Sequence, residues 1–298
     1  MMEAPFSRTP PRLLSVVIPA RNAAGLLAGQ LRALAGQTYA GPWEVVIADN
    51  GSTDGTAEVA RTSAGGVPAV RVVDASRRRG IDCARNEGAR AARGDFLLFC
   101  DADDEVSPTW LGEMAKAACT ADLVGGPLDR DTLNDPRTVA WRWPSPPDAL
   151  PVAHGFLPYA EGSNLGIWAD VLQALGGWNE DYAGGGDDVE LCWRAQLAGY
   201  RIGFAPQAVI RYRYRRELRA LARQLFWYGF GDTKLYRDFR SRGLQRPSVR
   251  HRLGQWCRLL ARAADLVHSP QSRGEWIRDA AYWAGRARGS IHHRVPFV

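Results

Sequence analysis

The 298-residue sequence has few cysteines, no long apolar run and neither of the common glycine-rich phosphate-binding motifs. Its five cysteines are scattered, odd in number and without a C-x-x-C pair, which argues against a disulfide framework or zinc knuckle and favours a reducing, cytoplasmic setting. The apolar run from Leu13 to Ala20 is too short to span a bilayer and predicts a strand, not a signal peptide or transmembrane helix. Because G-x-G-x-x-G does not follow that strand and no Walker A sequence exists, dinucleotide-binding dehydrogenases and P-loop NTPases are excluded.

The composition predicts a folded chain with an uneven charge distribution. With 46% apolar and 23% charged residues, 298 residues can bury a sizeable core. Residues 211–298 hold 20 Lys and Arg against 6 Asp and Glu, a net +14, whereas the preceding residues carry a net −8. A basic tail of this kind is typical of proteins that meet an anionic surface.

Apolar runs of strand length alternate with helical spacing in the first half of the chain. Strands are predicted at 13–19, 43–48, 70–74 and 95–100, and helices at 23–35, 55–63 and 81–93. Strands that are apolar throughout and separated by helices predict an α/β fold with a mostly parallel sheet flanked by helices.

The second half is less regular. Seven prolines in residues 127–160 predict a long loop or lid without long helices or strands. A helix is predicted at 187–198 and strands at 201–205 and 208–212. The tail from residue 215 is predicted to be helical in two or three pieces, broken near 243–247 and 269–270.

Three carboxylates, Asp101, Asp103 and Asp104, directly follow the fourth predicted strand. In an open parallel sheet ligands bind beyond the carboxyl ends of the strands, and adjacent carboxylates repel one another unless a cation lies among them. Mg²⁺ or Mn²⁺ accepts oxygen ligands of this kind. The alternative is a polar turn that caps the following helix. The turn at 49–56, after the second strand, is open to the same two interpretations.

Seven blocks in a fixed order resemble the family 2 glycosyltransferases, whose catalytic domain has the GT-A fold. They are SVVIPARN at 15–22, IADNGSTDGT at 47–56, ARNEG at 84–88, FCDADD at 99–104, GSN at 162–164, GGWNE at 176–180 and GDDVELCWR at 186–194. The resemblance implies a GT-A catalytic domain over residues 10–212, followed by a basic helical C-terminal region over residues 213–298.

The resemblance also implies a site for a nucleotide-sugar donor. The implied donor-binding residues are Pro19, Ala20, Arg21, Asp49, Arg85, Asp101, Ala102 and Asp103. Asp101 and Asp103 match the D-x-D motif and are the implied ligands of Mn²⁺ or Mg²⁺, which would neutralise the leaving nucleoside diphosphate.

Asp188 matches the acid that serves these enzymes as catalytic base, with Asp187 beside it. Because Asp188 begins a predicted helix, we expect the helix dipole to favour its ionised form, so that no raised pKa is required. Without the resemblance, both aspartates would be interpreted as helix caps. Asp187, Trp178, Asn164 and Arg211 are expected to contact the acceptor or to support the site.

Two departures from the family pattern bear on the expected activity. Tyr212 stands where many relatives have a histidine that binds the metal, and Arg211 and Arg213 could take over part of the neutralisation. The segment 224–227, QLFW, lacks one residue and the arginine of the Q-x-x-R-W motif of processive synthases. We therefore expect a single sugar addition and not polymerisation.

The function implied is a metal-dependent, inverting transfer of one sugar from a UDP-, dTDP- or GDP-linked donor to an acceptor hydroxyl, in polysaccharide, glycolipid or natural-product glycosylation. The alternative is a catalytically silent scaffold that binds nucleotide-sugars or glycans. A sugar-phosphate nucleotidyltransferase is disfavoured, because PARN at 19–22 is not a glycine-rich phosphate loop.

The basic tail interleaves arginine with leucine and tryptophan at helical spacing. We expect it to attach the enzyme peripherally to the inner face of the membrane or to a lipid-linked glycan acceptor, with a purely structural appendage or homodimer surface as the alternative. No nucleic-acid-binding module is present in the sequence, so a nucleic-acid partner is not expected.

Overall fold

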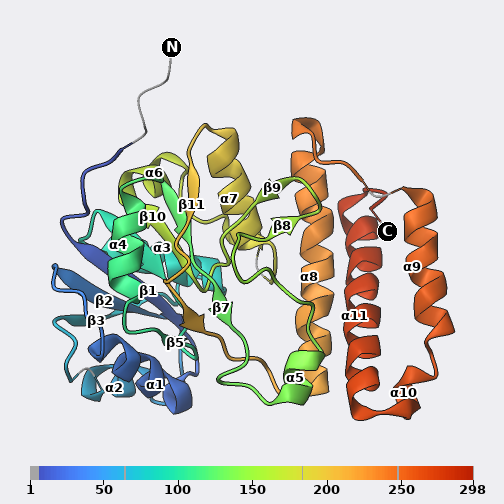
Figure 1. The fold of residues 1–298 in the computed structure, drawn as a ribbon, viewed down its shortest axis with the longest axis horizontal. Coiled ribbons are helices and arrows are strands. Elements are labelled where there is room, and N and C mark those ends of the chain that lie inside the picture. Colours follow the sequence, from blue (N-terminus) through green and yellow to red (C-terminus); the bar gives the residue numbers. More distant parts are fainter. Residues whose placement is uncertain (1–6, 64, 183, 247, 298) are drawn as a thin grey trace.

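The computed structural model describes residues 7–63, 65–182, 184–246 and 248–297. Its centre is a seven-stranded sheet in the order β11-β6-β10-β4-β1-β2-β3 (Figure 1). The strands in chain order are β1 (Leu14–Ala20), β2 (Trp43–Asp49), β3 (Val70–Asp74), β4 (Phe96–Phe99), β6 (Leu123–Gly125), β10 (Leu165–Trp168) and β11 (Ile202–Phe204). All neighbouring pairs are parallel except those that β10 makes with β4 and β6. The predicted α/β class is confirmed, and the antiparallel β10 is a feature that the sequence pattern did not predict.

Helices pack on the sheet through apolar side chains at helical spacing. The helices of this part are α1 (Ala24–Ala35), α2 (Thr56–Thr62), α3 (Ile81–Ala91), α4 (Trp110–Ala118), α6 (Ala169–Ala174), the 3₁₀ turn η1 (Glu180–Tyr182) and α7 (Asp187–Leu197). In α1, Leu27, Leu31 and Leu34 are fully buried, which is the spacing expected of one helix face. The core strands β1 and β4 are buried nearly throughout, as predicted from their apolar runs.

Short elements fill the proline-rich segment, as its composition predicted. They are β7 (Leu128–Asp129), α5 (Pro136–Ala140), β8 (Val152–Ala153) and β9 (Leu157–Pro158). β7 joins β5 (Glu105–Val106) and β12 (Ile210–Arg211) in a second, three-stranded sheet. Since β5 directly follows the three aspartates 101, 103 and 104, this small sheet fixes the segment that carries them.

The C-terminal helices pack both on one another and on the rest of the chain (Figure 1). They are α8 (Leu218–Phe239), the 3₁₀ turn η2 (Arg240–Arg242), α9 (Val249–Ala261), α10 (Asp265–His268) and α11 (Pro270–His293). Helices end close to both predicted breaks, near 243–247 and 269–270, whereas the further break between α9 and α10 was not predicted. α8 and α11 approach so closely that a Cβ atom on Gly285 would lie 1.9 Å from the carbonyl oxygen of Phe226. Leu235 and Phe239 of α8 share a hydrophobic cluster with Trp193 of α7. Since the C-terminal helices pack on the preceding part of the chain, the domain boundary expected between residues 212 and 213 stays a prediction.

In the described ranges, no helix combines the length and the apolar character needed to cross a bilayer.

Candidate active site

The three aspartates that follow β4 form a compact acidic cluster. One carboxylate oxygen from each of Asp101, Asp103 and Asp104 lies within 4.8 Å of the others. Oδ1 of Asp101 and Oδ2 of Asp104 are buried without a hydrogen-bond partner, while the other carboxylate oxygen of Asp104 accepts the backbone N–H of Arg213 at 2.8 Å. Burial raises the pKa of all three carboxyls, that of Asp101 to about 6. Unpaired, crowded carboxylate oxygens fit a hard divalent cation.

A buried arginine connects this cluster to the second pair of acids. Arg85, on α3, is 3% exposed. Its Nη2 atom lies 3.7 Å from Asp101 and its Nη1 atom 2.5 Å from Asp187. The guanidinium carbon also lies 4.3 Å from the centre of the Trp178 ring. Arg85 thus connects Asp101, just after β4, to Asp187 at the start of α7, although these two residues are 86 positions apart in the sequence.

Asp187 and Asp188 begin α7, as predicted. The preceding Gly186 has a φ of +82°, a conformation that glycine adopts without strain. The two oxygens of Asp188 accept the backbone N–H groups of Gly162 at 2.9 Å and Val189 at 2.8 Å. These bonds orient the carboxylate of Asp188 from two separate segments.

The pKa of Asp188 is raised, although the helix dipole was expected to favour the ionised form of this carboxyl. Desolvation, followed by the negative charge of Asp187, raises its pKa from 3.8 to about 7, although the N–H groups of Gly162 and Val189 and the charge of Arg85 act in the opposite direction. Burial next to a like charge therefore outweighs the helix dipole. A carboxyl whose pKa lies near neutrality suits the task of a general base.

Asp82 is a member of the site that the sequence analysis missed. It is 1% exposed on the first turn of α3, both of its oxygens lack a hydrogen-bond partner, and Oδ1 lies 3.6 Å from Arg85. Desolvation and the charge of Asp187 raise its pKa well above 3.8. No pattern in the sequence marks Asp82, because Asp187, the neighbour that raises its pKa, is more than 100 residues away and meets it only in the folded chain.

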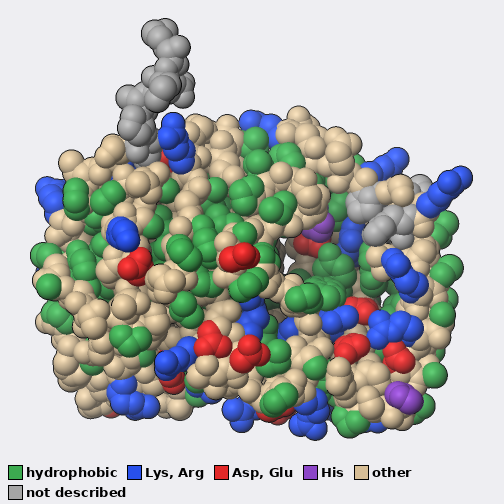
Figure 2. All heavy atoms as spheres, in the orientation of Figure 1, with side chains coloured by type: hydrophobic (Ala, Val, Ile, Leu, Met, Phe, Trp, Pro, Cys, Tyr) green, Lys and Arg blue, Asp and Glu red, His purple; other side chains and the backbone are tan. Residues whose placement is uncertain are grey.

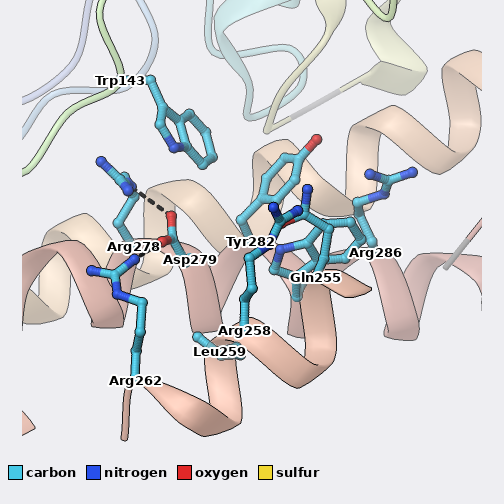
Figure 3. Close-up of a pocket in the computed structure, with 10 residues that line it drawn as sticks. Trp143, Gln255, Arg258, Leu259, Arg262, Arg278, Asp279, Tyr282 and Arg286 are labelled. Carbon is cyan, nitrogen blue, oxygen red and sulfur yellow. Dashed lines mark hydrogen bonds and ion pairs between the residues drawn. The ribbon is translucent and has the colours of Figure 1, made fainter. Parts of the chain in front are cut away.

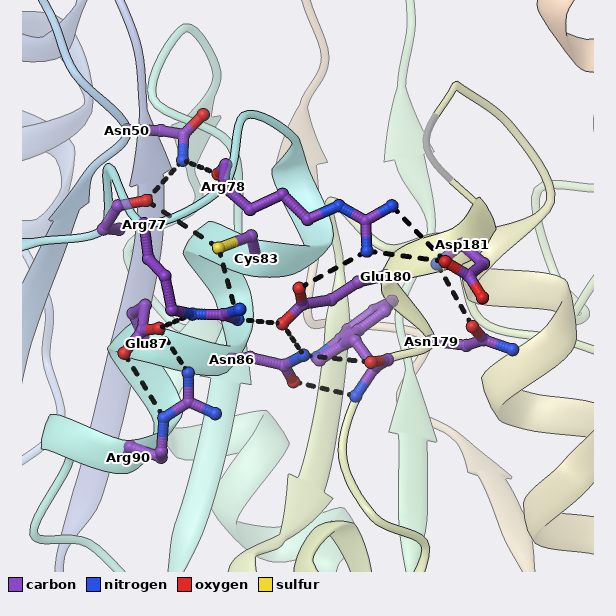
Figure 4. Close-up of polar contacts among 12 residues, drawn as sticks. Asn50, Arg77, Arg78, Cys83, Asn86, Glu87, Arg90, Asn179, Glu180 and Asp181 are labelled. Atoms are coloured by element: carbon purple, nitrogen blue, oxygen red, sulfur yellow. Dashed lines mark hydrogen bonds and ion pairs between the residues drawn. The ribbon is translucent and has the colours of Figure 1, made fainter.

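A polar network connects α3 to the segment that precedes α7 (Figure 4). The Asn86 amide donates to the carbonyl of Trp178 and accepts its N–H, both at 2.9 Å. Arg77 bonds Glu87 at 2.9 Å and Glu180 at 2.6 Å. Arg78 likewise pairs with Asp181 at 3.3 Å. Arg77 and Arg78 are therefore engaged in ion pairs that join α3 to the segment before α7.

The predicted donor residues of the first two strands lie at the same sheet edge as Asp101. Pro19 and Ala20 end β1 and pair with Ala48 and Asp49 at the end of β2. The carboxylate of Asp49 accepts the N–H of Ser52 at 2.9 Å, which forms the turn expected there. Arg21 is exposed beyond β1, and Ala102 is buried between the acids of the cluster.

Of the predicted acceptor or supporting residues, Trp178 and Asn164 lie in the core. Trp178 is 2% exposed and packs edge-on against Phe99 beneath the Arg85 guanidinium. Asn164 is fully buried, and its amide accepts from Trp110 and donates to two backbone carbonyls. Neither side chain lines the cavity described below, so contact with an acceptor is not available to them in this conformation.

Arg211 ends β12, and Tyr212 follows it directly. Arg211 lies 3.8 Å from Glu105 and does not line the cavity. Tyr212, which replaces the histidine of many relatives, does line it, and its pKa is raised well above 10 by burial and by the aspartates nearby. The phenol therefore stays neutral beside the acidic cluster.

One cavity of about 1340 Å³, which Arg85 and Tyr212 help to line, lies between the sheet and the C-terminal helices. Figure 2 shows the surface hollowed there, with acidic, basic and histidine side chains at its edge. Asp101, Asp187 and Asp188 line it from the sheet side, and Arg223, Tyr228 and other residues of α8 line it from the helical side. The sequence analysis did not predict that the basic tail would form a wall of the site.

Comparisons with known proteins agree with this arrangement. Residues 15–161 match the model of glycosyl transferase family 2, and residues 151–270 match that of glycosyl transferase family group 2. Glycosyltransferase AglE of Haloferax volcanii is 31% identical over 227 residues, which cover 75% of this chain and 74% of AglE. The pre-mycofactocin glycosyltransferase of Mycobacterium tuberculosis is 27% identical over 232 residues, and the chain spans only 46% of that relative's length.

Among solved structures, the mannosyltransferase PcManGT from Pyrobaculum calidifontis, in complex with GDP-Man and Mn²⁺, aligns with a TM-score of 0.63 at 21% identity. The alignment covers 97% of this chain and 91% of PcManGT. The mixed sheet with an acidic cluster at its carboxyl edge defines the GT-A glycosyltransferase class. Within that class, the chain belongs to glycosyltransferase family 2.

Proposed function

We propose that the chain transfers a single sugar from a nucleoside-diphosphate donor to an acceptor hydroxyl, with inversion at the anomeric carbon. The observation that carries this proposal is that Asp101 and Asp188 line one cavity and are connected through the buried Arg85. A site that combines a cation-binding cluster with a base of near-neutral pKa suits displacement of a diphosphate by a hydroxyl.

Asp188 is the proposed base. Its carboxylate accepts the proton of the acceptor hydroxyl while the hydroxyl oxygen bonds to the anomeric carbon. The bond from that carbon to the diphosphate oxygen breaks, and its electron pair leaves with the nucleoside diphosphate. The N–H groups of Gly162 and Val189 hold the carboxylate in place during the step.

Asp101 and Asp103, with Asp104 as a further oxygen donor, are the residues that would hold a divalent cation. Such a cation would neutralise the leaving diphosphate. PcManGT was solved with Mn²⁺ and GDP-Man, which supports divalent-cation use and a nucleotide-sugar donor here. Arg85 and the strand-end residues Pro19, Ala20, Arg21 and Asp49 remain the proposed donor contacts.

Donor turnover tests this proposal. The full chain, incubated with UDP-, dTDP- and GDP-sugars and Mn²⁺, should release one nucleoside diphosphate, and Asp188→Asn should lower that release by about 10²- to 10⁴-fold. Asp131→Asn, which changes an exposed acid outside the cavity, is the matched control. If the wild type binds a nucleotide-sugar but releases no more product than Asp188→Asn, the chain is the silent binding scaffold instead.

We also propose that the C-terminal helices attach the enzyme peripherally to an anionic membrane surface. Leu253 and Leu260 of α9 are 61% and 70% exposed and lie seven residues apart, hence on one helix face. Val267 of α10 is 82% exposed nearby in the sequence, and the tail carries a net +14. Co-sedimentation with anionic vesicles at low salt, reduced in Leu253→Ser/Leu260→Ser, is the expected result. A dimer in solution without vesicle binding would favour the homodimer alternative.

A further inference from the structure

The helical side of the cavity carries an excess of positive charge. Arg142, Arg215, Arg219, Arg223 and Arg278 line it. Apart from Asp101, Asp187 and Asp188 on the sheet side, the acids that line the cavity are already engaged: Glu161 pairs with Arg130 at 2.6 Å, and Asp232 pairs with His154 at 3.1 Å and accepts the Tyr282 hydroxyl. Three of the five arginines, Arg142, Arg219 and Arg223, form what we call the arginine wall.

Arg142 is held in place without a counter-ion. Its Nη1 donates to Gln224 of α8 at 2.9 Å, its Nη2 to the carbonyl of Arg215 at 3.3 Å, and its guanidinium carbon lies 4.4 Å from the centre of the Tyr214 ring. Its Nε is buried and lacks a hydrogen-bond partner. A partly desolvated cation oriented by neutral groups is a receptor for an anion.

Arg219 and Arg223 lie one turn apart on α8. No carboxylate of the described residues pairs with either one, and residues 218–231 contain no Asp or Glu. Arg219 stands in the first turn, where the helix dipole disfavours a positive charge and favours an anion. Two unpaired positive charges at this place are therefore electrostatically unfavourable in the free protein, and a bound anionic ligand would compensate them.

These arginines are distinct from those beside the acidic cluster. Arg213 donates its backbone N–H to Asp104 and its Nε to the carbonyl of Asp103. Among the described residues, no hydrogen bond or ion pair joins Arg219 or Arg223 to an acid of the cluster. The donor diphosphate beside the cluster would thus be neutralised by Arg213 and the cation, which leaves the arginine wall to another negative group.

A second cavity of about 360 Å³ continues this lining between α9 and α11 (Figure 3). It shares Trp143, Arg278 and Tyr282 with the large cavity. Arg262 and Arg278 there are compensated by acids, whereas the Nε of the buried Arg286 has no partner. Its volume lies at the lower end of the range of ligand pockets, so the rest of a bound molecule has room beyond Trp143.

We propose that the acceptor carries a phosphate group, which binds to Arg142, Arg219 and Arg223 while the acceptor hydroxyl reaches Asp188. Guanidinium groups bind phosphate oxygens through paired charge-assisted hydrogen bonds, and three of them match a doubly charged phosphate monoester better than a single carboxylate. The identification of this molecule as the acceptor rests on the transferase function proposed above, whereas the anion site itself does not.

Titration calorimetry on the full chain, without Mn²⁺ or donor, tests the site. The probes are inorganic phosphate, glucose 1-phosphate and farnesyl phosphate, with glucuronate as the carboxylate comparison. Arg219→Gln/Arg223→Gln changes two exposed arginines of the wall, and Arg216→Gln/Arg240→Gln changes two exposed arginines that do not line the cavity. We expect at least one phosphate ester to bind, about tenfold more weakly to the first variant and unchanged to the second.

The probes also separate the two sources of the phosphate. Tighter binding of farnesyl phosphate indicates a lipid-linked acceptor, and tighter binding of glucose 1-phosphate a soluble one; either result supports the site. Equal affinity of the wild type and the first variant, no binding of any phosphate ester, or glucuronate binding as tight as phosphate would overturn it. Nucleoside diphosphate with Mn²⁺ is titrated in parallel. If the first variant no longer binds nucleoside diphosphate, the arginine wall belongs to the donor site. If the wild type itself does not bind nucleoside diphosphate, that result counts against the proposed function alone.

Discussion

The raised pKa of Asp188 predicts how the rate of transfer depends on pH. Desolvation and the charge of Asp187 raise this pKa to about 7, and a base must be deprotonated to accept a proton. The value of kcat/KM should therefore fall on the acidic side with an apparent pKa near 7. At pH 6, one unit lower, about a tenth of the molecules would hold an ionised Asp188, so the rate should drop roughly tenfold.

Asp187→Asn moves this acidic limb in a predictable direction. Removing the neighbouring negative charge takes away a cause that raises the pKa of Asp188, so the limb should shift to lower pH. Glu180→Gln is a suitable control, because it removes a half-buried negative charge from the segment before α7, and Glu180 is not among the main groups that shift the pKa of Asp188.

The assay is initial-rate measurement of nucleoside diphosphate release from pH 5 to 9 at several Mn²⁺ concentrations. Since the pKa of Asp101 is also raised, to about 6, protonation of the acidic cluster could produce an acidic limb of its own. A limb from the cluster moves with Mn²⁺ concentration, because metal and proton compete for the same oxygens, whereas a limb from Asp188 does not. An acidic limb that follows Mn²⁺, or one that Asp187→Asn leaves in place, would refute the assignment.

Three further predictions concern metal binding and stability. Asp103→Asn should abolish the rise in melting temperature that Mn²⁺ gives to the wild type, and an equal rise in both proteins would contradict the proposed metal site. The pKa of Asp82 is raised in the folded state, so ionisation of this buried carboxyl destabilises the fold once the pH exceeds the pKa of the unfolded chain. Asp82→Asn should therefore raise the melting temperature at pH 8 and leave it unchanged near pH 4. A rise near pH 4 without one at pH 8 would count against this reasoning. Gly285→Ala should lower the free energy of unfolding by about 1–3 kcal/mol in urea titrations, because its Cβ meets the Phe226 carbonyl, whereas Gly254→Ala, where the Cβ meets no atom within 4 Å, should not destabilise the protein.

Local sequence patterns predicted most of the elements, and the reasons are physical. The strands β1, β2 and β4 are buried on both faces, so their sequences are apolar apart from residues such as Ser15 and Glu44, and they are easily detected. β10 escaped prediction because its four residues have the composition of a buried strand but nothing in them gives its direction. Direction depends on the path of the preceding segment 127–160, which local patterns do not encode.

Among the site residues, those in short motifs were found and those that act across the chain were not. Asp101, Asp103, Arg85 and Asp188 stand in blocks whose order alone identified them. Asp104 was grouped with its neighbours, but only the structure shows that its buried oxygen lacks a partner. Trp178 and Asn164 stand in equally recognisable blocks, yet they pack in the core.

The sequence by itself determined the α/β class, the acidic cluster, the helix that begins at Asp187 and the basic helical tail, because each depends on residues close together in the chain. Only the tertiary structure decided that Arg85 lies between Asp101 and Asp187, that Asp188 has a pKa near 7, and that α8 closes the cavity with arginines. Desolvation and charge proximity depend on which distant segments meet, and that is fixed when the sheet and the C-terminal helices pack together.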